Sequence, residues 1–135
     1  MKNLTTAIYG KLSGSALAAH IGTRMYKGRA PEEAAYPYIV YTIVSDVPNL
    51  TFSEDFEDVI IQFSLFSSTS SSTEVEDIYT DLKTLFDECT MSITSETLVW
   101  MIRQNTTQMV EDHTTRDGLI QVWHYAVDYY LMVKV

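Results

Sequence analysis

The residues that could support metal or nucleophilic chemistry are few and scattered. His20, His113 and His124 lie far apart and match neither the H-x-x-x-H nor the H-x-H spacing, so a zinc site is not expected. Cys89 continues the apolar positions of a predicted helix, where a cysteine usually packs as a small hydrophobic side chain. The serines of 67–72 lack the G-x-S-x-G elbow of a nucleophilic serine. We therefore predict that the protein is not an enzyme.

The glycines and the paired acids do not form a ligand-binding motif either. The five glycines make neither a phosphate loop nor a dinucleotide fingerprint. Acidic pairs stand at 54–55, 57–58 and 111–112, but the twelve-residue calcium loop with its glycine and terminal glutamate is absent. Such pairs are typical of solvated acidic loops. We expect no cofactor and no metal.

Charge is distributed unevenly along the chain. Residues 1–31 contain five of the nine basic residues and none of the 18 acidic ones, whereas the whole chain has a net charge of −9. A protein this acidic is not expected to bind nucleic acid over its whole surface. The asymmetry fits a basic arm for polyanions, two complementary faces that dock head to tail, or a basic segment without a special role.

Length and composition favour one domain spanning 1–135. With 135 residues, 46% of them apolar, the chain is long enough to bury its own core. Its single cysteine excludes an internal disulfide framework, and its first residues lack the apolar run of a signal peptide. Because no run of eighteen apolar residues occurs, we expect a soluble protein of a reducing compartment, without a membrane partner.

The periodicity of the first half predicts a helix, a short turn and strands. Asn3 can cap a helix with apolar residues at 3–4 residue spacing up to Leu12, and Gly22 is a plausible stop for a short turn that follows. A short edge strand is expected at 23–27. β-branched and aromatic residues then predict strands at 37–47 and 56–66.

The second half predicts a helix between strands. Thr73 and Glu76 fit a capping box at the start of a helix at 73–88. The expected core face of this helix comprises Val75, Ile78, Leu82, Leu85, Phe86 and Cys89. Strands are expected at 97–107 and 119–134, joined by a polar connection at 107–118. In the first of these strands, the alternation places Leu98, Trp100 and Ile102 on one face, and Val99, Met101 and Arg103 on a less buried one. The predicted fold class is α+β, with an antiparallel or mixed β-sheet and two helices packed on one face.

Several segments together resemble a known family. A G-x-R-x-Y-x-G-x-x-P pattern occupies Gly22–Pro31 and is followed by P-Y-I-V-Y at Pro37–Tyr41. Further matching segments are DVIIQFSLFS at 58–67, EVEDIYTDLKTLFD at 74–87 and RDGLIQVWHYAVDY at 116–129. These resemble the tail completion proteins of long-tailed bacteriophages, the tail terminator or head–tail joining family. The connection at 107–118 and the serine-rich 67–73 tract are longer than that pattern needs.

The resemblance implies a structural protein without an active site. It implies a homo-hexameric ring that ends tail-tube polymerisation and joins the tail to the head. The implied partners are further copies of the chain, the major tail tube protein and the head–tail connector proteins, with DNA passing through the ring unbound. The implied location is the virion, at the head–tail interface, after assembly in the host cytoplasm.

Interface candidates follow from charge and from the loops. We expect subunit or tube contacts at the basic residues Arg24, Lys27 and Arg29. The polar loops at 46–58 and 107–118 are expected to project past strand ends at one end of the sheet and to carry partner contacts. Their candidates are Asp46, Glu54, Asp55, Glu57, Asp58, Glu111, Asp112, Arg116 and Asp117.

Two other classes of protein remain open on the residues alone. A small-molecule- or peptide-binding α+β domain without catalysis would have a closed apolar pocket and would be a monomer. An esterase- or nuclease-like enzyme would bring His, Asp, Glu or Cys side chains together in the fold.

Overall fold

Six strands and three helices make up the computed structural model, which describes residues 2–135. The helices are α1 (Lys2–Leu12), α2 (Ala18–Ile21) and α3 (Thr73–Phe86). The strands are β1 (Met25–Lys27), β2 (Tyr38–Leu50), β3 (Asp55–Ser67), β4 (Ser92–Ile93), β5 (Glu96–Thr115) and β6 (Gly118–Lys134).

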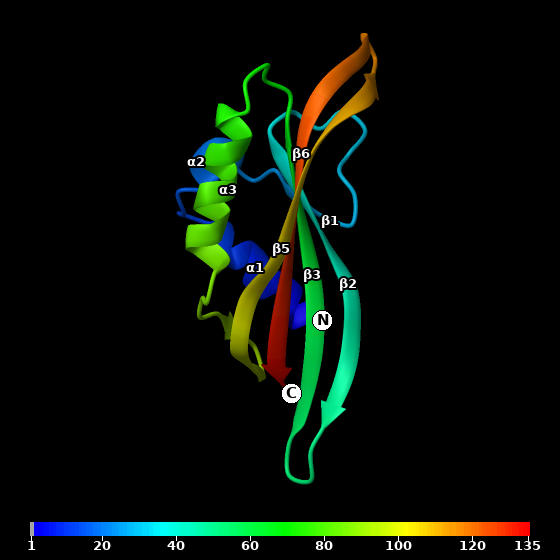
Figure 1. Ribbon diagram of the computed structural model, residues 1–135. Coiled ribbons are helices and arrows are strands. Elements are labelled where there is room, and N and C mark those ends of the chain that lie inside the picture. Colours follow the sequence, from blue (N-terminus) through cyan, green and yellow to red (C-terminus); the bar gives the residue numbers. More distant parts are fainter. Residues whose placement is uncertain (1) are drawn as a thin grey trace.

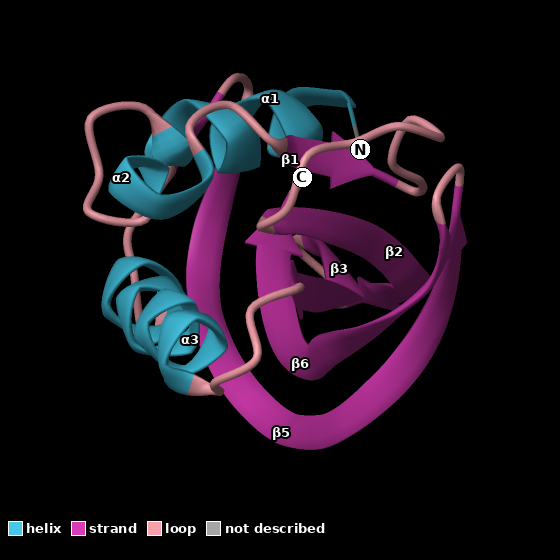
Figure 2. Ribbon diagram, turned by 90° about the horizontal axis from the view of Figure 1, so that it is seen from above, coloured by secondary structure: helices cyan, strands magenta, loops and turns pink. Residues whose placement is uncertain are grey.

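The strands form one sheet in the order β1-β2-β3-β6-β5-β4. β1 pairs with β2 in parallel and every other pair is antiparallel, so the sheet is mixed. All three helices lie on one side of the sheet, and the sheet curls strongly around its other face (Figure 1, Figure 2). The predicted α+β class is confirmed, with the short α2 added to the two expected helices.

Alternation of apolar residues in the central strands builds the core. Val59, Ile61, Phe63 and Leu65 of β3 are fully buried, as are Val127, Tyr129 and Leu131 of β6. These residues lie in the same core as the buried residues of the helices, and Phe86 of α3 stacks on Phe63 with ring centroids 4.9 Å apart. Burying one such large apolar side chain contributes about 1.5–3 kcal/mol. The core of the described chain therefore lies between the helices and the middle of the sheet.

The predicted burial pattern of β5 is wrong after its first residues. Met101 is fully buried and reaches the core, whereas Trp100 and Ile102 are more than 40% exposed. The cause is a register shift between Leu98 and Trp100, where β5 carries a residue that β6 does not match. A bulge of this kind inserts one residue and moves the side chains that follow it to the opposite face, until a second register shift between Arg103 and Asn105 reverses the change.

The predicted capping box of α3 is also wrong. The N-cap is Ser72, and neither its side chain nor that of Thr73 makes the cap hydrogen bond within the described chain. The backbone N–H of Glu76 donates to the carbonyl of Ser72 instead, and the carboxylate of Glu74 accepts from Ser67 Oγ at 2.8 Å. Glu74 thus ties the first turn of the helix to the end of β3.

Two segments expected as loops are largely strand. The 46–58 segment shortens to a turn at 51–54, and the 107–118 connection is the outer half of the β5–β6 hairpin with its turn at 116–117. In the outer half of the β5–β6 hairpin, at 107–120, the side chains on both faces of the sheet are exposed or only partly buried. The alternation that marks a half-buried strand is therefore missing from its threonine-rich sequence.

Candidate interaction surfaces

The two long hairpins project from opposite ends of the molecule (Figure 1). The β2–β3 turn precedes β3 and the β5–β6 turn precedes β6. Because β3 and β6 are antiparallel neighbours, their starting points must lie at opposite ends of the sheet. The expectation that both predicted loops share one end is therefore wrong.

The β2–β3 tip is a tight turn with exposed apolar side chains. Thr51 closes it, since its backbone N–H and its hydroxyl both donate to the carbonyl of Glu54 at 2.9 Å. Leu50 is 70% exposed, and Phe52 is as exposed as a side chain can be. Lys134 Nζ lies 2.7 Å from Glu54 Oε1 and ties the turn to the end of β6. The tip is thus held in shape while its phenyl ring points into solvent.

Acidic side chains lie on both strands of the β2–β3 hairpin, beside its tip and further along it. Asp55 and Asp46 are exposed, and Glu57 is half-buried beside them. Burial, together with repulsion from Asp46, raises the pKa of Glu57 above its ordinary value. Asp58 is more engaged, since its carboxylate accepts from Asn49 Nδ2 at 3.3 Å. The β2–β3 hairpin is therefore a negatively charged arm with an apolar end.

The β5–β6 tip is held by the chain segment that precedes β2. Arg116 at the turn forms an ion pair with Glu33. The Tyr36 hydroxyl and His113 Nδ1 are hydrogen-bonded at 2.8 Å. Asp112 and Asp117 are exposed on the same hairpin. The structure thus brings Arg116 to a partner within its own chain.

The side chains of Glu111, His113 and His124 form a cluster in the outer half of the β5–β6 hairpin, which the sequence analysis did not predict. Glu111 Oε1 lies 3.2 Å from His113 Nε2 and 3.1 Å from His124 Nδ1, and His124 stacks on Phe66 at 4.4 Å. Burial acts to raise the pKa of Glu111, but the hydrogen bonds and charges of His124 and His113 outweigh it and hold that pKa below its ordinary value. The pairing of β5 with β6 brings these side chains together, so their spacing in the sequence does not predict the cluster. Within residues 2–135, no group of three or more metal-binding side chains has the geometry to hold an ion.

The three basic candidates divide into two kinds. The guanidinium of Arg24 donates from Nε to the carbonyl of Pro37 at 2.9 Å and from a terminal nitrogen to that of His20 at 3.3 Å. Arg24 therefore joins α2 to the start of β2. Lys27 and Arg29 are exposed, and among the described residues neither forms an ion pair. Only these last two are available to a partner.

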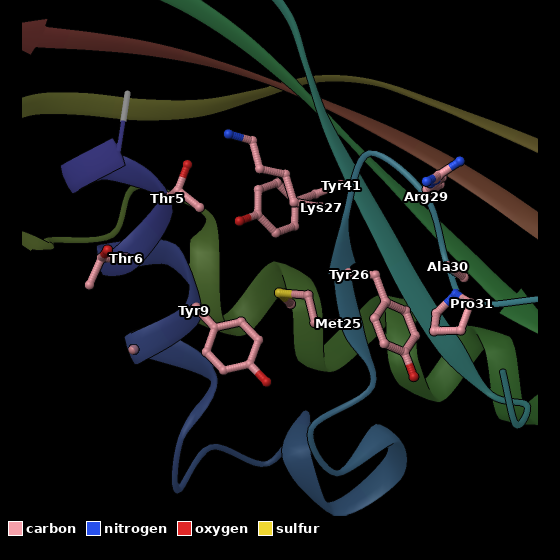
Figure 3. A pocket seen from close by; sticks show the side chains of 11 residues that line it. Thr5, Thr6, Tyr9, Met25, Tyr26, Lys27, Arg29, Ala30, Pro31 and Tyr41 are labelled. Carbon is pink, nitrogen blue, oxygen red and sulfur yellow. The ribbon is translucent and has the colours of Figure 1, made fainter.

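Lys27 and Arg29 stand beside a groove between α1 and β1, with a volume of about 900 Å³ (Figure 3). Its floor contains Met25 and Tyr41, which are 2% and 1% exposed. The rings of Tyr9 from α1 and Tyr26 from β1 flank Met25. The lining is mainly apolar and is completed by Thr5, Thr6, Gly10, Ala30 and Pro31. The groove can hold an aromatic side chain and part of an extended backbone.

A comparison with protein families matches residues 6–133 to the model of "Tail completion protein gp17". The chain belongs to this tail completion family. The match covers nearly the whole chain, so the resemblance read from the sequence is confirmed. Membership gives the chain a structural role in a bacteriophage tail, and structural tail proteins are generally not enzymes.

Solved structures share the fold of this tail completion protein. A chain from the "Virion of native gene transfer agent (GTA) particle" superposes with a TM-score of 0.78 and 14% identity, covering 98% of this chain and 95% of that one. A second solved chain superposes with a TM-score of 0.58 and 18% identity, covering 96% and 94%. At these identities the likeness concerns the fold alone. A comparison with curated proteins finds no match.

Membrane insertion through a helix is not indicated for this tail completion protein. Across residues 2–135, every helix is too short or too polar to cross a bilayer.

Proposed function

We propose that the protein ends polymerisation of the tail tube and forms a ring, a homo-hexamer, that joins the tail to the head connector. The observation that carries this proposal is the family match over 6–133. The fold shared with a chain of a phage-like virion supports a place in the particle, at the head–tail interface. The partners would be further copies of the chain, the major tail tube protein and the connector proteins, assembled in the host cytoplasm.

The arrangement of the hairpins supports a joining role. A subunit that connects two structures needs contact elements at both of its ends. The β2–β3 and β5–β6 hairpins extend from opposite ends of one sheet (Figure 1). One end could therefore face the tube or a neighbouring subunit while the other faces the connector.

The charge of the protein suits a ring through which DNA passes without being held. The net charge is −9, and both hairpins carry exposed carboxylates. Each acid near a phosphate adds repulsion. We expect the purified protein to bind duplex DNA no better than an unrelated acidic protein at physiological salt.

Electron microscopy of particles made without the protein tests the proposal. In a phage whose copy of this gene is deleted, we expect tails of irregular length that are not joined to heads, and restoration by the gene in trans. Native mass spectrometry of the purified protein should detect a hexamer. Tails of normal length attached to heads in the deletion strain would contradict the proposed role.

The groove between α1 and β1 favours a second candidate, a peptide- or small-molecule-binding domain without catalysis. Its lining is mainly apolar, and its floor is buried. This candidate predicts a monomer that binds apolar ligands, so the same mass spectrum distinguishes it from a ring.

A further inference from the structure

We propose that the groove between α1 and β1 binds the β2–β3 tip of a neighbouring copy of the chain, with Phe52 of that copy inserted between Tyr9 and Tyr26. This inference rests on the proposed ring and names the contact that builds it. It assigns a binding function to the groove and to the exposed tip together.

The groove has the chemistry of a site for an aromatic anchor. Two tyrosine rings stand on either side of the nearly buried Met25 side chain (Figure 3). Aromatic rings pair favourably in offset or edge-to-face arrangements, and a thioether makes favourable contacts with a ring edge. A phenyl ring placed over Met25 would meet all three side chains at once.

The β2–β3 tip has the shape and chemistry of the matching element. Its turn is fixed by the hydrogen bonds of Thr51 and by the Lys134–Glu54 ion pair, so little conformational entropy is lost when it binds. It presents Phe52 and Leu50, both strongly exposed and separated in the sequence only by Thr51. Aromatic residues that become buried in a pocket carry most of the energy of typical protein interfaces.

Charge favours the same pairing. Lys27 and Arg29 are exposed at the rim of the groove. Exposed acids lie on the β2–β3 hairpin, with Asp55 beside the turn and Asp46 four residues before Leu50. Within one subunit, burial and, after it, repulsion from Asp46 raise the pKa of Glu57, so these two carboxylates lie close enough to repel each other. Cations from a neighbouring subunit would relieve this repulsion. Opposite potentials on the two surfaces also steer the subunits into one orientation.

The occupant must come from another copy. Tyr41 in the groove floor and Leu50 at the tip are nine residues apart on β2, which corresponds to roughly 30 Å of extended strand. The tip therefore cannot fold back into the groove of its own chain. Because groove and tip are different surfaces, their contact is heterologous, and repeating it generates a ring if the rotation closes.

Cysteine cross-linking tests the contact directly. The variant combines Gly10→Cys in the groove with Ser53→Cys at the tip, and Cys89→Ala removes the native thiol. Ser53 is exposed in the same turn, so this change keeps the Phe52 side chain. A Cβ at Gly10 meets nothing within 4 Å, so this change is not expected to disturb α1. In the matched control, Leu119→Cys replaces Ser53→Cys, because Leu119 is also exposed and lies on the other hairpin.

We expect a ladder of disulfide-linked oligomers up to the ring size on non-reducing gels, in the purified protein and in purified particles. The Leu119→Cys control and each single-cysteine variant should remain monomeric on the gel. Native mass spectrometry of the Cys89→Ala parent separates the two proposals. A hexamer without cross-links between positions 10 and 53 would overturn the groove contact but leave the ring intact. A monomer in solution, together with an absence of cross-links in particles, would overturn both proposals.

Two further variants keep the result independent of cysteine chemistry. Phe52→Ala should raise the dissociation constant of the oligomer about tenfold or more, as expected for an aromatic anchor. The pair Lys27→Glu and Arg29→Glu should weaken assembly, and adding Asp46→Lys with Asp55→Lys should restore it. Assembly that is unaffected by Phe52→Ala, or binding of a small apolar ligand in the groove of the intact oligomer, would contradict the proposal.

Discussion

The β2–β3 and β5–β6 hairpins are built from neighbouring strands of one sheet, yet they end differently. The β5–β6 turn is contacted by the segment before β2, through the Arg116–Glu33 ion pair and the Tyr36–His113 hydrogen bond. The β2–β3 turn is closed by its own residues and by the Lys134–Glu54 ion pair, and its Leu50 and Phe52 side chains face solvent. Both tips are thus held by their own chain, but of the two only the β2–β3 tip presents an aromatic ring to solvent.

The difference in exposed aromatic surface indicates which of the two tips binds a neighbouring subunit. A hairpin that is held by polar contacts can act as a rigid extension whose position does not depend on binding. Exposed aromatic surface at the end of a fixed turn costs solubility, and such surface usually marks an interaction site. We therefore assign subunit contact to the β2–β3 tip and expect the β5–β6 tip to keep its shape with or without partners.

The largest expected effect comes from the core that both hairpins share. Leu82 is fully buried on α3, so Leu82→Ala should lower the free energy of unfolding by about 2–5 kcal/mol. Because both hairpins grow from the same sheet, their amides should lose protection from hydrogen exchange together. Urea denaturation and exchange measurements check this. A loss below about 0.5 kcal/mol, the range of a surface substitution, would show that this face of α3 is not core.

The next largest effect should separate the two hairpins. Tyr36→Phe removes the hydroxyl that bonds to His113 and should cost roughly 0.5–1.5 kcal/mol, the usual net value of one hydrogen bond. Faster hydrogen exchange is expected in the outer β5–β6 hairpin and not at the β2–β3 turn. Thr51→Ala is the matched variant at the other tip and should have the reverse pattern. Equal acceleration at both tips would contradict separate bracing.

Acid should affect the two hairpins in opposite directions. The pKa of Glu111 is lowered in the fold, so its contribution to stability is present above its ordinary pKa of 4.5 and is lost as the pH falls through the lowered value. The pKa of Glu57 is raised, so the fold binds this proton more tightly than the unfolded chain does. Stability in the β2–β3 hairpin is therefore gained as the pH falls through that raised value.

Hydrogen exchange of each hairpin between pH 7 and pH 3 measures this contrast. Glu111→Gln should remove the acid response of the β5–β6 hairpin, and Glu57→Gln should remove that of the β2–β3 hairpin. Because both side chains are only partly buried, solvent screens their interactions, and we expect effects smaller than that of Tyr36→Phe. Parallel responses of the two hairpins would show that their acids do not act locally.

The sequence predicted the parts of the fold that depend on regular periodicity. The core face of α3 and the alternation of β3 and β6 were correct because those elements meet the core along their whole length. Trp100 and Met101 were assigned to the wrong faces because a bulge depends on the pairing partner, which a single strand does not reveal. The outer half of β5 was missed because a ribbon with two polar faces lacks the alternating pattern.

The candidate site was harder to predict because it depends on tertiary contacts, which the sequence of one segment does not reveal. Lys27 and Arg29 were chosen by charge, and the structure places both beside a groove. Arg24 has equal charge, but its hydrogen bonds to Pro37 and His20 depend on tertiary packing. Phe52 was not a candidate, since an aromatic residue in a polar stretch does not reveal its exposure. The groove unites residues of α1 and β1, and only the fold brings those elements together.

The smallest expected effect on stability is at Phe52, and it is the sharpest test of the comparison between the tips. Because this side chain is fully exposed, Phe52→Ser should change the free energy of unfolding of the monomer by no more than about 0.5 kcal/mol. Leu119→Ser, at the other hairpin, should also leave the free energy of unfolding nearly unchanged. Urea denaturation of both variants checks this. A loss of 1 kcal/mol or more for Phe52→Ser would mean that the ring packs against its own chain and is not free to bind another. If both variants are silent in folding and only Phe52→Ser prevents assembly, then the exposed phenyl ring acts between subunits. The two tips would then differ in function as they differ in contacts.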